Sequence, residues 1–341
     1  MFMIRRCYFV IDVIIPTYEA HDFLAIGLHS LACQTFASKL HVYIVDDCSS
    51  RGYEEIVKPF RRNLKITILK TPYNSGPGFA RQYGIDHSDS PYITFMDADD
   101  VFYYVRAIQD LYEVMENNSA DEVIGNFAEE LANGTVYIHY CNDVWMHGKM
   151  YRRSFLEENN IRMNNTTANE DTGFNQLTRM VAKNIQNLDQ VVYYWKVNPN
   201  SICRQNNNEY SFGGLKGFIY NMVWAVKEAE KRDSDVERRG TVVIQALMEI
   251  YYNYLRFSNR PDAKKLIRWS CDLKDLYDKY IQVLSNEAIK NAYRALVNKG
   301  AGMVDPVFLA NNKYSFDDFL KDIDKVQRGT KKQKIVKNRE S

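Results

Sequence analysis

Tyr92-Ile93-Thr94-Phe95-Met96-Asp97-Ala98-Asp99-Asp100 is an apolar run that ends abruptly in three carboxylates. Such a run predicts a buried strand that delivers acids to its carboxyl end, where open α/β sheets place their ligands. Mg²⁺ keeps several waters and is typically bound through one or two carboxylates plus substrate phosphates. An Asp-x-Asp pair in this place therefore suits a nucleotide diphosphate and indicates chemistry on an activated phosphate ester. The alternative is a solvated acidic turn.

Apolar runs and helical patterns alternate on both sides of this stretch. Strands are expected at 10–16, 40–45 and 65–70, and helices at 23–34, 53–60 and 79–87. This alternation indicates a parallel sheet with crossover connections. Further elements are expected as a helix at 101–117, strands at 122–127 and 135–140, a strand end and helix at 148–159, a helix at 172–184 and a strand at 191–195. The predicted fold class is α/β, a mixed, mainly parallel sheet flanked by helices, with antiparallel members added after the acidic turn.

From about residue 213 the pattern is helical alone, with helices expected at 215–231, 236–258, 263–280 and 286–299. We predict a catalytic domain over 1–210, a C-terminal helical region over 211–326 and a basic, disordered tail over 327–341. A basic tail can contact an anionic membrane, although each exposed Lys contributes only about 1 kcal/mol.

The net charge and the spacing of the cysteines argue against a nucleic-acid-binding protein, a zinc site and a disulfide framework. Lys and Arg number 44 against 43 Asp and Glu, a formal charge of +1 that does not favour a nucleic-acid partner. The six cysteines lack C-x-x-C spacing, which disfavours a zinc site or a disulfide framework. No run approaches the roughly 18 to 20 apolar residues of a membrane span, and the first residues lack a convincing signal peptide. We expect a soluble, cytoplasmic protein, and leave open a peripheral contact with the inner membrane face and a homodimer.

Five motifs follow one another in the N-terminal part of the chain. They are Val13-Ile14-Ile15-Pro16-Thr17-Tyr18, Val45-Asp46-Asp47-Cys48-Ser49, Asn74-Ser75-Gly76-Pro77-Gly78-Phe79-Ala80-Arg81, Asp97-Ala98-Asp99 and Asn169-Glu170-Asp171. Together they resemble the ordered motifs of family-2 glycosyltransferases with the A-type, Rossmann-like fold, over roughly residues 10 to 205. The resemblance implies a metal-dependent inverting transfer of a sugar from a nucleotide diphosphate sugar, first of all a UDP-sugar, to an acceptor hydroxyl on a glycan or glycoconjugate.

The resemblance implies a nucleoside site made by the first strand's end and the Asp-Asp pair, namely Pro16, Thr17, Tyr18, Asp46 and Asp47. Asp47 is expected to accept a charge-assisted hydrogen bond from a uracil N–H. The alternative is that Asp46 and Asp47 cap the next helix through turn chemistry. Gly76 lies in the loop before a helix whose first amides can face phosphate. Arg81 and Lys196 can add positive charge there, or can be ordinary solvated residues.

For the reaction itself, the resemblance implies that Asp99 touches Mn²⁺ or Mg²⁺ and that Asp97 lies near the ribose or the metal's water shell. Asp100 is expected as a supporting acid or a helix cap. The resemblance assigns the catalytic base to Asp171, with Glu170 orienting it or the acceptor. The alternative is that Glu170 and Asp171 are first-turn acids that suit a helix dipole.

The segment around Trp145 and His147 resembles the part that lies beneath donor sugar and acceptor, so Trp145 is expected to stack on a sugar and His147 to hydrogen-bond a hydroxyl. Core packing and a satisfied buried histidine are the alternatives. His147 is not expected to bind metal, because no second histidine stands at ligand spacing.

Two departures from the common family pattern are present: Cys48 stands where glycine usually follows the Asp-Asp pair, and no Gln-x-x-Arg-Trp sequence of processive synthases occurs. These features favour single-sugar transfer. A retaining transferase, a catalytically silent nucleotide-sugar-binding module and a transferase acting on a modified DNA base remain the rival interpretations.

Overall fold

The computed structural model describes residues 9–142, 144–166, 168–198, 209–304 and 306–337. The chain divides into two compact units, Met1–Gln205 and Asn206–Ser341, where the sequence predicted a boundary after residue 210.

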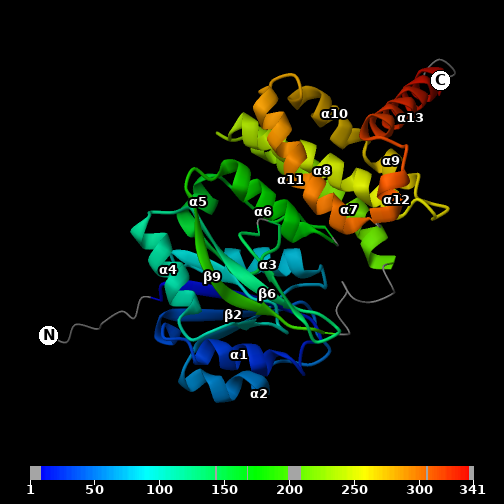
Figure 1. Ribbon diagram of the computed structural model, residues 1–341. Helices are drawn as coiled ribbons and strands as arrows, with labels where there is room; N and C mark the ends of the chain where they lie inside the picture. Colours follow the sequence, from blue (N-terminus) through cyan, green and yellow to red (C-terminus); the bar gives the residue numbers. More distant parts are fainter. Residues whose placement is uncertain (1–8, 143, 167, 199–208, 305, 338–341) are drawn as a thin grey trace. The chain divides into compact units, whose positions relative to one another are not determined.

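The first unit is built on a mixed sheet (Figure 1). Its strands are β1 (Ile11–Thr17), β2 (Leu40–Asp46), β3 (Lys65–Lys70), β4 (Tyr92–Phe95), β5 (Val101–Phe102), β6 (Glu122–Glu130), β7 (Val136–His139), β8 (Lys149–Arg152) and β9 (Ile185–Trp195). Within the described residues they are ordered β3-β2-β1-β4-β8-β6-β9-β5, with β7 paired to β6. Strands β1 to β4 are parallel, as are β6 and β9, whereas β5, β7 and β8 pair with antiparallel neighbours. The expected antiparallel members are thus confirmed.

Strand β1 shows how the sequence fits this sheet. It lies between β2 and β4 and is almost entirely buried, as its β-branched apolar run predicts. Pro16 has no N–H to give to a ladder, and it lies beyond Ile14, the last β1 residue that pairs with β4. The proline is therefore tolerated at the carboxyl end of a central strand.

Helices cover both faces of the sheet, with α1 and α2 below it and α3 and α6 above it in Figure 1. The helices of this unit are α1 (Leu24–Ala32), α2 (Glu54–Val57), α3 (Pro77–Asp86), α4 (Ala107–Asn117), α5 (Arg153–Glu158) and α6 (Glu170–Val181), with short 3₁₀ turns at Ala37–Lys39 and Lys58–Arg62. Val13 packs in one core cluster with Leu28 of α1 and Leu111 of α4. The neighbouring Ile14 faces the other way, toward Gly84 of α3.

The helix expected at 101–117 is wrong in its first residues. Val101 and Phe102 instead form β5, which pairs with Tyr194 and Tyr193 of β9, and α4 begins at Ala107. A local pattern cannot reveal this pairing, because the partner strand lies far along the chain.

Regular structure in the described part of the second unit is helical, as expected. The helices are α7 (Glu209–Glu230), α8 (Val236–Arg256), α9 (Lys265–Trp269), α10 (Cys271–Tyr280), α11 (Asn286–Met303), α12 (Pro306–Asn311) and α13 (Phe316–Lys337). The helix expected at 263–280 is divided at Ser270 into α9 and α10. Across the described residues, no helix combines the length and the apolar character needed to cross a membrane.

The tail expected to be disordered from residue 327 is helical as far as Lys337. Helix α13 is anchored upstream, where Ser315 accepts a hydrogen bond from the Asp318 backbone at 3.1 Å and Phe319 and Ile323 are fully buried. Once nucleated in this way, a helix extends at low cost through residues with good helix propensity such as Lys and Gln.

Candidate active site

The acidic stretch leaves β4 as a turn that Tyr193 of β9 holds in place. The Tyr193 hydroxyl accepts a hydrogen bond from the backbone N–H of Asp97 at 3.0 Å and donates one to the Asp100 carboxylate at 2.8 Å. The backbone N–H of Lys196 donates to the other oxygen of Asp100 at 2.9 Å. Strand β9 therefore fixes the conformation of the turn at the end of β4. Tyr193 was not among the site residues predicted from the sequence, because nothing local distinguishes it from a core tyrosine.

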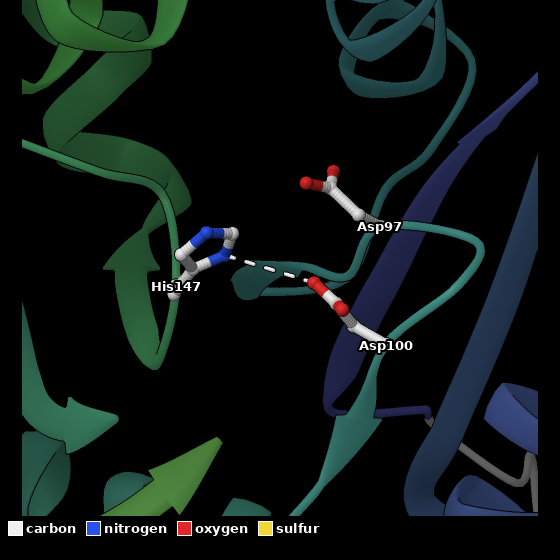
Figure 2. A group of neighbouring side chains, drawn as sticks. All are labelled: Asp97, Asp100 and His147. Carbon is white, nitrogen blue, oxygen red and sulfur yellow. Dashed lines mark ion pairs between the residues drawn. The ribbon is translucent and has the colours of Figure 1, made fainter. Parts of the chain in front are cut away.

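Asp97, Asp100 and His147 point toward one another (Figure 2). Each offers one ligand atom, and these atoms all lie within 4.8 Å of one another. Burial lowers the pKa of His147 to about 4, so its imidazole is neutral at pH 7 and can act as a ligand. Carboxylate oxygens suit Mg²⁺ and Mn²⁺, and a neutral imidazole is a common metal ligand. This group is therefore a plausible donor set for a divalent cation.

The charges around Asp100 support this fit. Its side chain is fully buried, and burial followed by the neighbouring Asp97 and Asp99 raises its pKa well above the ordinary value. An ionised carboxylate with such neighbours is costly unless a cation compensates it. For Asp97, burial is again the largest cause, but the Arg81 guanidinium and the nearby His147 together outweigh it and hold the pKa of Asp97 below its ordinary value.

The candidate cation site differs from the sequence interpretation in two respects. Asp99, expected to touch the metal, accepts a hydrogen bond from the Asn198 side chain at 2.8 Å and is outside the Asp97, Asp100 and His147 group. His147, set aside for lack of a second histidine, lies with its Nδ1 4.0 Å from Asp100 Oδ2. The fold supplies carboxylates from a distant turn as its neighbours, which sequence spacing could not reveal.

Arg81 of α3 joins the acidic turn to the start of α6. Its guanidinium is buried and contacts Asp97 at 2.7 Å and Glu170 at 2.9 Å. Both contacts are charge-assisted hydrogen bonds, which are stronger than neutral ones. From the sequence, Arg81 was predicted either to add positive charge near a diphosphate or to be an ordinary solvated residue. Its guanidinium is buried and engaged by two carboxylates, so the solvated alternative is wrong, whereas a role at a diphosphate stays a prediction.

Glu170 and Asp171 begin helix α6, after Asn169 in the left-handed conformation at φ 58°. Burial and then the nearby Asp171 raise the pKa of Glu170 to about 7, although Arg81 opposes them. Burial also raises the pKa of Asp171, again against Arg81. A helix dipole alone would favour the ionised acids. The surroundings of this pair thus differ from those of ordinary first-turn acids, which are solvated.

Asp47 organises the loop that precedes α3. Its carboxylate accepts hydrogen bonds from the Thr71 hydroxyl at 2.8 Å and from the backbone N–H groups of Ser75 and Gly76 at 3.1 and 2.7 Å. Asp46 accepts one from the Ser49 backbone at 2.8 Å. Neither side chain caps α2, whose cap carries no side-chain hydrogen bond. The alternative of helix capping is therefore wrong, although both residues do shape turns.

Cys48, between these turns, adopts the left-handed φ of 66°. This conformation favours glycine, which accounts for glycine at this place in the common family pattern. Nearby, the Thr17 hydroxyl donates to the Val45 carbonyl at 3.1 Å, so Thr17 is a buried structural contact, whereas Tyr18 is 58% exposed. The end of β1 thus carries one buried, hydrogen-bonded side chain, that of Thr17, followed by the largely exposed side chain of Tyr18.

Trp145 and His147 lie on the carboxyl-end side of β9. The Trp145 ring centre is 5.5 Å from that of Trp195, and His147 stacks on Tyr193 at 5.0 Å. Trp145 is half-buried and His147 is buried. His147 thus lies beside the acidic turn, and Trp145 is connected to it through Trp195. Trp195, their shared neighbour, was missed by the sequence analysis.

Comparison with known proteins identifies the family. A sequence profile described as Glycosyl transferase family 2 matches residues 12–183, which contain β1 to β4, the acidic turn and the Glu170-Asp171 pair. The chain belongs to glycosyl transferase family 2. The resemblance that the five motifs indicated is thereby confirmed.

Named relatives in this family match part of their length. TarS of Staphylococcus aureus, a poly(ribitol-phosphate) beta-N-acetylglucosaminyltransferase, is 25% identical over 200 residues, which cover 54% of this chain and 35% of TarS. Glycosyltransferase GlyA of Streptococcus pneumoniae is 23% identical over 222 residues, 57% of this chain and 31% of GlyA. The chain thus spans about a third of the length of these two relatives.

The family-2 fold is also seen in solved structures. Crystal structures of S. aureus TarS 1-349 in complex with UDP-GlcNAc and with UDP match with TM-scores of 0.68 and 0.66, at 18% identity. Each match covers 94% of this chain and 92% of the TarS chain. The A-type glycosyltransferase fold with a following helical region is thereby confirmed.

Proposed function

We propose that this family-2 chain is a metal-dependent inverting glycosyltransferase that moves a sugar from a UDP-sugar to a hydroxyl of a glycan or glycoconjugate. The observation that carries the proposal is the Arg81 bridge. It ties Asp97 of the candidate cation site to Glu170, whose neighbour Asp171 is the candidate base. The choice of a UDP-sugar is supported by the TarS complexes with UDP and UDP-GlcNAc.

The nucleoside is proposed to bind over the strand ends of β1 and β2. The residues concerned are Pro16, Thr17, Tyr18, Asp46, Asp47 and Gly76. Tyr18, being 58% exposed, can offer its ring to the nucleobase, while the Asp46 and Asp47 side chains hold the adjoining turns in position. Lys196, whose backbone already meets the acidic turn, is proposed to direct its ammonium group at the diphosphate.

Asp97, Asp100 and His147 would hold the divalent cation, with Asp99 as a further acid on the same turn. A bound Mn²⁺ or Mg²⁺ neutralises negative charge on the departing diphosphate. Arg81 cannot replace it, because that guanidinium is engaged by Asp97 and Glu170.

Asp171 acts as the base. It takes the proton from the acceptor hydroxyl while that oxygen attacks the anomeric carbon from the face opposite the diphosphate. The new glycosidic bond forms as the bond from the anomeric carbon to the diphosphate oxygen breaks, and UDP leaves with the electron pair. Burial raises the pKa of Asp171 and thus makes it a stronger base than a solvated aspartate. Glu170, fixed by Arg81, positions the first turn of α6 that carries this base.

The test uses purified full chain, Mn²⁺ and a panel of UDP-sugars, with release of UDP and transfer to added glycans as readouts. Asp171→Asn should lower transfer at least about 100-fold, as expected for loss of a general base. Asp272→Asn is a matched control, because Asp272 is an exposed first-turn acid of α10 and should leave transfer unchanged. Transfer by Asp171→Asn at the wild-type rate would overturn the inverting mechanism and favour a retaining one. Donor binding without any release of UDP would support a silent binding module.

A further inference from the structure

Aromatic side chains from three neighbouring strands share one face of the sheet. Phe127 of β6 lies opposite His139 of β7 and opposite Tyr193 of β9, and Glu129 lies opposite Tyr137 and Trp195 in the same ladders. Because side chains alternate between faces along a strand, residues in register with one another project to the same side. Figure 1 shows β6 and β9 side by side in this part of the sheet.

These rings form a continuous series that begins at the candidate cation site. The ring centre of His147 is 5.1 Å from Trp195, and Trp195 is 5.5 Å from Trp145. Trp145 is 4.9 Å from His139, which is 4.7 Å from Tyr137. Each of these separations falls within the 4.5–7 Å range of favourable aromatic pairs. We call this series, His147, Trp195, Trp145, His139 and Tyr137, the aromatic strip.

Exposure increases along the strip. His147 is buried, Trp195, Trp145 and His139 are half-buried, and Tyr137 is 58% exposed. If these rings only packed in the hydrophobic core, the series would not end at a largely exposed tyrosine on β7. The strip therefore has the form of a surface that leads outward from the cation site.

The strip also carries hydrogen-bonding groups and negative charge. His139 Nε2 lies 2.9 Å from Glu129 Oε2, and Glu129 is in register with both Tyr137 and Trp195. Rings with polar groups between them suit a sugar, whose ring has apolar C–H faces and hydroxyl edges. A carboxylate in this position disfavours an anionic chain, because like charges repel.

We propose that the aromatic strip is an acceptor subsite that binds a neutral glycan chain and leads its terminal hydroxyl toward the anomeric carbon of a donor held beside the cation site, with Tyr137 as the outer stacking residue. This inference rests on the proposed function, since a glycosyl acceptor must reach the anomeric carbon of the donor. It goes beyond that function by naming the chemistry of the acceptor and the residues that select it.

The test measures binding of neutral oligosaccharides, namely chitotetraose, cellotetraose and maltotetraose, by titration of tryptophan fluorescence in the full chain with Mn²⁺ and UDP present. At least one should bind wild type, and Tyr137→Ala should weaken that binding about tenfold. Tyr137→Phe, which keeps the ring, should restore it. Tyr140→Ala is the matched control, because Tyr140 is 69% exposed, lies just beyond the end of β7 and is not one of the five rings of the strip.

Failure of all three oligosaccharides to bind, or equal weakening by Tyr137→Ala and Tyr140→Ala, would overturn the inference. Binding of a poly(ribitol phosphate) chain in a Tyr137-dependent manner, without binding of the neutral sugars, would also overturn it. UDP release in the absence of acceptor tests the proposed function separately. Glycan binding that depends on Tyr137, without UDP release, would support the strip as a glycan-binding surface and contradict the proposed transferase activity.

Discussion

Gly78 of α3 lies so close to Glu170 that a Cβ atom on Gly78 would stand 2.5 Å from Glu170 Cγ and 3.0 Å from its Cβ. The glycine in this motif thus allows α3 to approach α6 and lets Arg81, one turn further along α3, reach the Glu170 carboxylate.

Gly78→Ala should therefore displace Glu170 and with it the first turn of α6. Because a shift of about 1 Å can cost 10²-fold in rate, we expect transfer to fall about 10- to 100-fold. The control is Gly213→Ala, since a Cβ on Gly213 in α7 would meet nothing within 4 Å. That variant should keep its activity and gain up to about 1 kcal/mol in stability. Equal activities of the two variants, measured by UDP release, would contradict this role of Gly78.

The Arg81 bridge predicts a large loss of stability when it is removed. Arg81→Ala leaves the buried Glu170 and the partly exposed Asp97 without their cation, which should cost about 3 kcal/mol, the lower end of the range for breaking a buried ion pair. Arg106→Ala removes an exposed cation that also contacts two carboxylates, Asp110 and Glu113, and should cost at most about 1 kcal/mol. Urea unfolding of the full chain at pH 8 measures both. Similar midpoints for the two variants would mean that the bridge is not structural.

The sequence predicted the parallel half of the sheet because buried parallel strands appear as uninterrupted apolar runs. The run at 40–45 lies within β2, Leu40–Asp46, and the run ending at Phe95 contains β4. The motif glycines and acids could also be placed, because a strand followed by turn residues determines which end of the sheet they occupy.

The partners of those acids could not be predicted. Asp100 is held by Tyr193, and Arg81 reaches Glu170, through contacts that join distant segments. Neither Tyr193 nor Trp195 is marked by a local pattern, since a half-buried strand with aromatic residues is typical of any sheet. One signal was available in the sequence. Tyr193 and Trp195 are two positions apart, as are Phe127 and Glu129, and residues two positions apart on a strand project to the same face of the sheet.

Titration of Glu170 predicts how stability changes with pH. The folded-state pKa of about 7 is raised above the ordinary 4.5, mainly by burial, so between these values the folded chain holds a proton that the unfolded chain has lost. The stability contributed by this group is therefore full below pH 4.5 and is lost as the pH rises through about 7. Glu170→Gln does not titrate at this position. The melting temperature of wild type relative to Glu170→Gln should fall between pH 5 and pH 8, and a constant difference by scanning calorimetry would contradict the raised pKa.

Asp99 and Asp100 lie on the same turn, and each is a candidate ligand for the cation. Their effects on metal binding can be measured separately. Asp100 lies with Asp97 and His147 in the group whose ligand atoms are within 4.8 Å of one another, whereas Asp99 accepts a hydrogen bond from Asn198. With UDP present, Mn²⁺ at 100 times its dissociation constant should stabilise wild type by about 2.7 kcal/mol, because it binds the folded state. Asp100→Asn should abolish most of this thermal shift and Asp99→Asn should retain it. The opposite order would assign the cation to the Asp97 and Asp99 pair of the sequence motif. The thermal shift of each variant is measured relative to the same variant without Mn²⁺. This reference is needed because Asp100→Asn changes stability by itself: it removes a buried carboxylate whose raised pKa disfavours its charged form.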